Sequence, residues 1–132
     1  MIVAPRGACS LLAPAPTGRT QHGPHSGERF DENASWHTPG RGRIAGDYKG
    51  RDAVFGQFGR YGGETAGTFK ATLQHVFTTE DGRVVGLHRN TATRNGKQLD
   101  VACCLSFELK DGRVTVGREH IYVLYAWEEF WA

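Results

Sequence analysis

Histidine and cysteine are the residue types of this sequence best suited to chemistry, and it holds six of the first and three of the second. The cysteines are Cys9 and the adjacent pair Cys103 and Cys104, which form neither a CxxC metal pattern nor an even-numbered disulfide framework. His22 and His25 stand close together, but in a Gly/Pro-rich segment where we expect them to be solvated. We therefore expect no metal site and no cofactor, and reduced thiols indicate a cytoplasmic protein.

The elements that position these residues are delimited by three turn dipeptides, Asp81-Gly82, Asn95-Gly96 and Asp111-Gly112. Both central residues of a type I′ turn need positive φ, which Asn, Asp and Gly tolerate. The segments around the turns are rich in β-branched and aromatic residues, which favour strands. The sequence therefore predicts three hairpins and an antiparallel meander over residues 68–78, 83–93, 98–109 and 113–122.

Residues 98–109 show the period of a strand with one buried face. Leu99, Val101, Cys103 and Leu105 fall on one side, and the residues between them fall on the other. Ahead of the meander, residues 51–61 place Val54, Phe58 and other large apolar side chains at helical spacing, which predicts one short amphipathic helix. We expect this helix to depend on packing against the sheet, because its two internal glycines weaken it.

Length and charge bound the remaining possibilities. A chain of 132 residues has room for one domain. All the tryptophans, tyrosines and phenylalanines lie from Phe30 onward, so residues 1–29, rich in Pro and Gly, are expected to form a disordered or aberrant N-terminal tail. From Asp31 onward the 13 basic and 13 acidic residues are interspersed, which argues against a nucleic-acid partner. No stretch is apolar over a length that would span a membrane.

Several motifs, in this order, resemble the SnoaL-like branch of the nuclear transport factor 2-like superfamily, which includes the ketosteroid isomerases. They are Asp31-Glu32-Asn33-Ala34-Ser35-Trp36-His37-Thr38-Pro39-Gly40, Ala45-Gly46-Asp47-Tyr48-Lys49-Gly50-Arg51, Arg94-Asn95-Gly96-Lys97-Gln98-Leu99-Asp100, Phe107 through Val114, and Glu128-Glu129-Phe130-Trp131. The resemblance covers residues 30–132. It implies an α+β fold, a conical barrel whose curved antiparallel sheet surrounds a pocket for a small, mostly apolar molecule. The long N-terminal helix usual in the family is expected to be absent, because residues 1–29 are too rich in Pro and Gly.

The resemblance also implies where a reaction would occur. It places His37 at the position of the isomerases' catalytic carboxylate, and a pKa of ~6.5 suits a histidine to act as a general base. The alternative is a strand-end histidine that is hydrogen-bonded to the backbone. Cys103 matches the isomerases' proton-donating aspartate, and no tyrosine corresponds to their second donor, so steroid isomerisation by that mechanism is not expected. We expect Cys103 to be an inert thiol of the core.

The same comparison implies a pocket lining with a few polar groups. Glu119 is the second candidate for acid–base chemistry, since a buried glutamate and a histidine beside it shift each other's pKa. The alternative is a buried Glu–His pair that only neutralises its own charge and closes the cone. A register slip of one residue would exchange His88 for Arg89 and Glu119 for Arg118. The aromatic C-terminal segment either rims the pocket or fills the core. The expected ligand-binding residues are Trp36, Gly86, His88, Asn90, Leu99, Val101, Cys103, Gly117, Ile121 and Tyr122.

Two functions follow from these expectations. The first is a domain that binds a small apolar molecule and transfers a proton next to a carbonyl, as a cofactor-independent isomerase, cyclase or dehydratase would, with His37 as base. The second is a non-catalytic association module, in which a sheet face without its usual helix pairs with a second copy of the chain. A homodimer is expected in either case.

Overall fold

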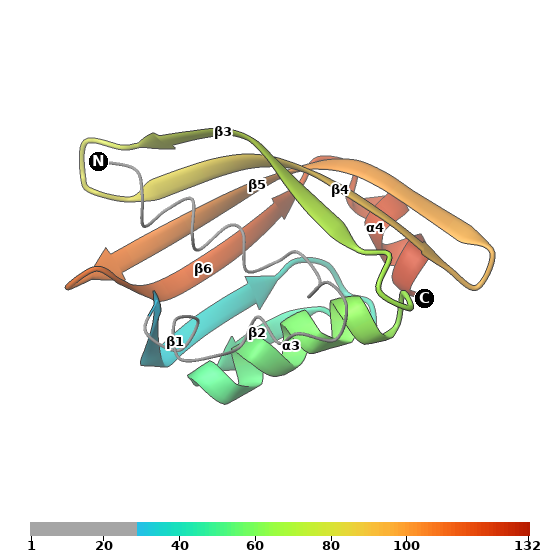
Figure 1. Cartoon of the computed structure of the whole chain (residues 1–132), viewed down its shortest axis with the longest axis horizontal. Helices are drawn as coiled ribbons and strands as arrows, with labels where there is room; N and C mark the ends of the chain where they lie inside the picture. Colours follow the sequence, from blue (N-terminus) through green and yellow to red (C-terminus); the bar gives the residue numbers. More distant parts are fainter. Residues whose placement is uncertain (1–28) are drawn as a thin grey trace.

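The computed structural model of the chain describes residues 29–132, so the predicted N-terminal tail falls outside the described residues except for Arg29. Six strands and two helices make up the described part (Figure 1). The strands are β1 (Phe30–Thr38), β2 (Gly46–Lys49), β3 (Lys70–Thr78), β4 (Val84–Arg94), β5 (Lys97–Lys110) and β6 (Arg113–Ile121). The helices are α3 (Arg51–Gly63) and α4 (Leu124–Trp131). The predicted meander and the helix before it are confirmed, and α4 is a helix that the sequence did not predict.

The strands form one curved sheet in the order β2-β1-β6-β5-β4-β3, with β2 and β3 at its edges. The prediction of an antiparallel sheet needs one correction, because β1 runs parallel to β6 and the sheet is therefore mixed. No hairpin joins these two strands, so no turn dictates their relative direction. The sheet is not closed: it curves around the core as an open half-barrel.

The hairpin turns differ in type. Asn95 and Gly96 both adopt positive φ, as do Asp111 and Gly112, which fits the type I′ prediction for these two turns. At the first hairpin only Gly82 has positive φ, and its N–H bonds the Thr79 carbonyl oxygen at 3.1 Å. That connection is a longer loop in which glycine alone takes the left-handed conformation, so the type I′ prediction is wrong there.

Alternate residues of the long strands face the interior. In β4 every second residue from Val84 to Ala92 is buried, and in β5 every second residue from Leu99 to Phe107 is buried. Register pairing aligns these two sets across the strands, so they form one continuous inner face. The predicted parity of β5 is confirmed, and the register slip does not occur, since His88 and Glu119 are buried while Arg89 and Arg118 are exposed.

The helices cover parts of the inner face. Figure 1 shows α3 lying against β1 and β2, and α4 near the β4–β5 hairpin. Helix α3 buries Val54, Phe58 and Tyr61, and α4 buries Trp127, Phe130 and Trp131, so the aromatic C-terminal segment largely fills the core. Within residues 29–132, neither helix is long and apolar enough to cross a membrane.

Candidate functional site

A carboxylate from the last strand lies at the centre of the buried polar groups. Oxygen Oε1 of Glu119, a residue 1% exposed, accepts three hydrogen bonds from residues of two elements. The Tyr61 hydroxyl of α3 donates at 2.6 Å, the Thr38 hydroxyl of β1 at 3.0 Å and the Trp36 indole N–H of β1 at 3.1 Å. These donors fix the position of the carboxylate from one side.

A glutamine of α3 supports two of the donors. Gln57 Nε2 lies 3.0 Å from the Thr38 hydroxyl, 3.2 Å from the Tyr61 hydroxyl and 3.1 Å from the Ile44 carbonyl oxygen. As a donor, the Gln57 amide leaves the hydroxyl protons of Thr38 and Tyr61 free to point at Glu119. The three donors therefore form a preorganised set around one oxygen, and Gln57 supports two of them.

Burial changes the proton affinity of these groups. Removal from water raises the pKa of Glu119 above its usual range, and the hydrogen bonds from Tyr61, Trp36 and Thr38 oppose that rise. Burial also raises the pKa of Tyr61, and the negative charge of Glu119 adds to the effect. Tyr61 is therefore a stable neutral donor, while Glu119 is a carboxyl group poised to exchange a proton nearer neutral pH than an exposed glutamate.

Other polar atoms of the inner face have no hydrogen-bond partner among the described residues. They include Oε2 of Glu119, both ring nitrogens of His88 and both amide atoms of Asn90. Burial lowers the pKa of His88, so its imidazole is neutral at pH 7. A native interior rarely leaves so many polar atoms unpaired, and ordered water or a bound molecule is the usual partner.

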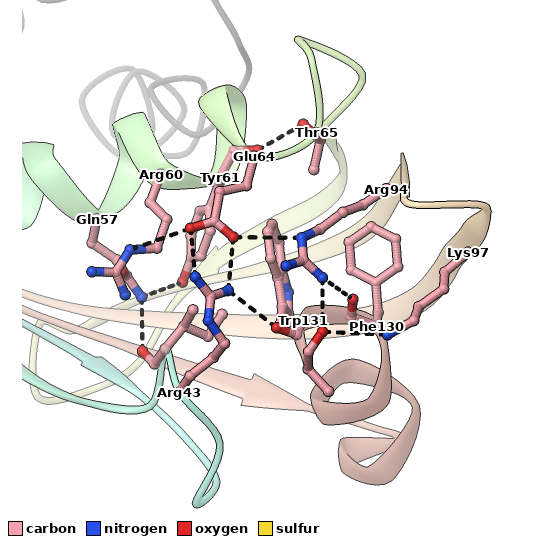
Figure 2. Close-up of polar contacts among 12 residues, drawn as sticks. Arg43, Gln57, Arg60, Tyr61, Glu64, Thr65, Arg94, Lys97, Phe130 and Trp131 are labelled. Atoms are coloured by element: carbon pink, nitrogen blue, oxygen red, sulfur yellow. Dashed lines mark hydrogen bonds and ion pairs between the residues drawn. The ribbon is translucent and has the colours of Figure 1, made fainter.

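A second cluster of polar residues lies at the C-terminal ends of α3 and α4 and has a structural role. Figure 2 shows Glu64, just after α3, between Arg43, Arg60 and Arg94. Arg43 binds the carboxylate with two nitrogens at 2.7 and 3.0 Å and also donates to the Trp131 carbonyl oxygen at 3.1 Å. Because Arg94 likewise donates to the Phe130 carbonyl oxygen, these residues tie the C-terminal end of α4 to the end of α3.

The structure corrects the predicted position of His37. Its side chain lies on the outer face of β1, is 39% exposed and bonds Asp47 through Nδ1 at 2.7 Å. Trp36 and Thr38 point inward instead, because successive residues of a strand face opposite sides. The prediction that His37 and Glu119 share one cavity is therefore wrong, and any base role of His37 would be exerted from the outer face. Its partner is a carboxylate and not the backbone.

The other predicted lining residues divide between the interior and the surface. Tyr122 is 62% exposed and lies outside, so its predicted position is also wrong. Ile121 is half-buried at the end of β6. The remaining predicted residues are buried: Trp36, Gly86, His88, Asn90, Leu99, Val101, Cys103 and Gly117. Burial raises the pKa of the Cys103 thiol, which agrees with an inert core thiol.

One predicted lining residue has no space beside it. A Cβ atom at Gly117 would lie 2.4 Å from Cε3 of Trp36, so the indole packs directly on the glycine backbone. This close approach allows the Trp36 N–H to reach Glu119, two residues further along the same strand. Gly117 therefore positions Trp36, and any ligand must lie elsewhere on the inner face.

Three residues of the site were not predicted: Thr38, Gln57 and Tyr61. Tyr61 is one of the large side chains at helical spacing in residues 51–61, which predicts a place on the apolar face of the helix. Gln57 is polar and so does not contribute to an apolar pattern. The helical spacing of Gln57 and Tyr61, four residues apart, was the available signal. Among residues 29–132, no three histidine, cysteine or carboxylate side chains converge closely enough to hold a metal ion.

Comparison with known proteins identifies the family of this chain and agrees with its fold. A family model described as the SnoaL-like domain matches residues 23–117. The chain belongs to the SnoaL-like family. The match begins within the predicted tail, so the domain boundary at Phe30 stays a prediction.

Relatives of this SnoaL-like domain are similar in sequence, in structure or in both. Uncharacterized proteins of Mycobacterium tuberculosis and Mycobacterium bovis are 32% identical over 103 residues, which is 78% of this chain and 79% of theirs. The structure of Bal32a, from a soil-derived mobile gene cassette, is 60% identical, covers 97% of this chain and 92% of its own, and has a TM-score of 0.82. TerC, co-crystallised with polyporic acid, is 13% identical with a TM-score of 0.68 over 96% of both chains, a likeness of fold alone.

Proposed function

We propose that this SnoaL-like domain binds a small, mostly apolar molecule against the inner face of its sheet, and that Glu119 exchanges a proton with that molecule. One observation carries the proposal: in a fully buried carboxylate, Oε1 holds three donors while Oε2 has no partner among the described residues. A purely structural carboxylate would use both oxygens, because an unpaired buried oxygen costs about 1–3 kcal/mol. Oε2 is therefore the atom that meets the ligand.

The surroundings of Glu119 suit proton transfer next to a carbonyl. In such a step, Oε2 takes a proton from the carbon beside the carbonyl, the electron pair of the broken C–H bond forms an enolate, and the neutral carboxyl group returns the proton at another position. The raised pKa brings Glu119 towards the range in which it serves as both base and acid. The three donors on Oε1 hold the orientation of the carboxyl group during both transfers.

The similar fold of TerC supports an interior that accepts a small molecule, since TerC was crystallised with polyporic acid. The described interior of this chain is suited to an apolar frame, because Trp36, Phe58, Tyr61 and Trp127 supply aromatic surface around Glu119. No redox group is needed for the proposed step, and the domain needs only a positioned carboxyl group and a dry interior.

Deuterium exchange tests this function without knowledge of the natural substrate. In D2O, the protein should accelerate replacement of the α-protons of 2-tetralone, a small apolar ketone, as followed by proton NMR. Glu119→Gln should reduce the rate at least ~100-fold, because a general base contributes about 10²–10⁴-fold. His37→Gln is the matched comparison and should retain the rate. Loss of exchange in His37→Gln alone would restore His37 as base, and no acceleration by the wild type would refute the proton transfer.

Self-association is a second proposed function, favoured by one feature of the surface. Tyr122, Val123 and Tyr125, at the junction of β6 and α4, are 62%, 36% and 77% exposed. Adjacent exposed aromatic side chains are typical of a protein–protein contact, and a second copy of the chain is the proposed partner. Sedimentation equilibrium at micromolar concentration should show a dimer, and Tyr122→Lys with Tyr125→Lys should convert it to a monomer. A monomeric wild type would refute this proposal.

A further inference from the structure

Two polar residues of β4 face the interior without a partner that meets hydrogen-bond geometry among the described residues. His88 and Asn90 are successive inward-facing residues of this strand, and each is 1% exposed. On the neighbouring strands, His88 pairs with Leu73 and Cys103, while Asn90 pairs with Ala71 and Val101. The two side chains therefore lie in a row of apolar or weakly polar neighbours.

Asn90 lies beside the Cys103 thiol and His88 beside the Gly86 backbone, but no side-chain nitrogen or oxygen atom of the pair has a partner with hydrogen-bond geometry among the described residues. Apolar residues would suit both positions better for stability, because unpaired polar atoms in an interior lose their contacts with water and gain nothing in return. The other inward positions of the same strand carry no polar side chain, since they hold Val84, Gly86 and Ala92. His88 and Asn90 therefore need a partner that residues 29–132 do not supply.

The pair is separate from the groups that hold Glu119. On β5, Cys103 pairs with His88 of β4 and Leu105 pairs with Glu119 of β6. Cys103 and Leu105 are successive inward-facing residues, so the pair and the carboxylate lie on either side of β5 and are offset along it. A molecule lying across the inner face of β5 would have one end at His88 and Asn90 and the other at Glu119.

We propose that His88 and Asn90 form a recognition site for a hydroxyl group, so that the ligand class is a neutral hydroxylated molecule with an apolar frame. This inference rests on the proposed binding function and names the ligand's polar group. A neutral imidazole offers one donor and one acceptor, and a carboxamide offers both as well, which matches a hydroxyl group that donates and accepts. An anionic group does not fit, since no basic side chain among the described residues is buried with the pair.

A matched pair of probes tests the site, namely 2-naphthol and naphthalene, which differ by one hydroxyl group. Equilibrium dialysis should show that the wild type binds 2-naphthol at least 10-fold more tightly than naphthalene. In His88→Leu and Asn90→Leu, this preference should fall to about 3-fold or less, while affinity for naphthalene is retained. Thr91→Val, at the outward-facing position that follows Asn90 on β4, is the control and should keep the preference.

Thermal unfolding of the same variants separates ligand recognition from a structural role. Because residues 29–132 leave the polar atoms of the pair without hydrogen bonds, His88→Leu and Asn90→Leu should raise the melting temperature while they lose the preference for 2-naphthol. A lower melting temperature with an unchanged preference would overturn the inference, since the pair would then be satisfied by ordered water and serve the fold.

Two further outcomes separate this inference from the proposed function. If Glu119→Gln removes the preference for 2-naphthol while His88→Leu and Asn90→Leu keep it, the hydroxyl site is at Glu119 and the inference is overturned. Equal binding of both probes by the wild type would also overturn it and leave the binding function in place. If neither probe binds, the proposed binding of small apolar molecules fails together with the inference.

Discussion

The Tyr61 hydroxyl donates a 2.6 Å hydrogen bond to Oε1 of Glu119, which joins the last full turn of α3 to the end of β6. Both side chains are fully buried, and 58 residues separate them in the sequence. A charged acceptor makes such a bond stronger than one between neutral groups. The bond therefore fixes the carboxylate and also holds the helix on the sheet.

Tyr61→Phe should destabilise the protein by about 2 kcal/mol, because it removes one donor from a buried carboxylate and leaves the Gln57 amide without that acceptor. Urea denaturation at pH 7 measures the loss. Tyr125→Phe, which changes a side chain that is 77% exposed, is the matched control and should alter stability by less than about 0.5 kcal/mol. Equal effects of the two substitutions would show that the Tyr61 hydroxyl contributes nothing specific.

In Glu119→Gln, the free energy of unfolding should fall less as the pH rises than it does in the wild type. Burial raises the pKa of Glu119 in the folded state above the ordinary value of 4.5, so the folded protein binds more protons than the unfolded chain between those two values. The stability of the wild type therefore falls as pH rises through this interval, relative to a variant that cannot ionise. The free-energy difference between Glu119→Gln and wild type, measured by urea denaturation from pH 4 to 8, should grow in favour of the variant. A constant difference would show that Glu119 does not titrate there.

For Glu64→Gln, the stability relative to wild type should change with pH in the opposite direction. The Arg43 guanidinium holds the pKa of the Glu64 carboxyl below its ordinary value, so this ion pair stabilises the fold above pH 4.5 and the contribution is lost as pH falls through the lowered pKa. The variant should be less stable than wild type at pH 7, and the difference should be smaller at pH 2.5. Glu80→Gln, which removes the carboxylate of an exposed residue, is the control. An equal loss at both pH values would refute an ionic role of Glu64.

Gly117→Ala should destabilise the protein by about 1–3 kcal/mol, since the new methyl group would overlap the Trp36 ring and displace it. Gly56→Ala is the matched control, because its Cβ would contact nothing within 4 Å and alanine favours the helix by about 0.5–1 kcal/mol. The two substitutions should shift the urea midpoint in opposite directions. A stabilising Gly117→Ala would refute the close packing of Trp36 on β6.

The sequence predicted local structure well where one strong signal determined it. The turn dipeptides predicted the meander, and the alternation of β5 predicted which of its residues face inward. The family resemblance placed His88, Asn90 and Glu119 inside, which the structure confirms. It also placed His37 inside, although the inward neighbours Trp36 and Thr38 require the opposite face for it. Residues 30–38 hold few apolar side chains and show no clear alternation, so the pattern alone does not determine which residues of β1 face inward.

The residues that hold Glu119 could not be predicted either, and the reason differs from that for His37. Thr38, Gln57 and Tyr61 lie on two elements distant in sequence from β6, and only the packing of α3 against β1 brings them together. The parallel pairing of β1 with β6 could not be predicted from the sequence pattern for the same reason. No turn connects the two strands directly, so no local signal indicates their relative direction. Long-range contacts of this kind depend on the complete fold.

Carbon-13 NMR of the Glu119 side-chain carboxyl group tests the central claim most directly, in protein labelled at the glutamate carboxyl carbons and titrated with 2-naphthol. The Glu119 signal is identified by its absence from Glu119→Gln. The account predicts that this signal moves saturably with 2-naphthol, while the signal of the exposed Glu80 stays in place. Saturable binding with an unmoved Glu119 signal, or no saturable binding at all, would contradict the claim that a small molecule binds beside this carboxylate.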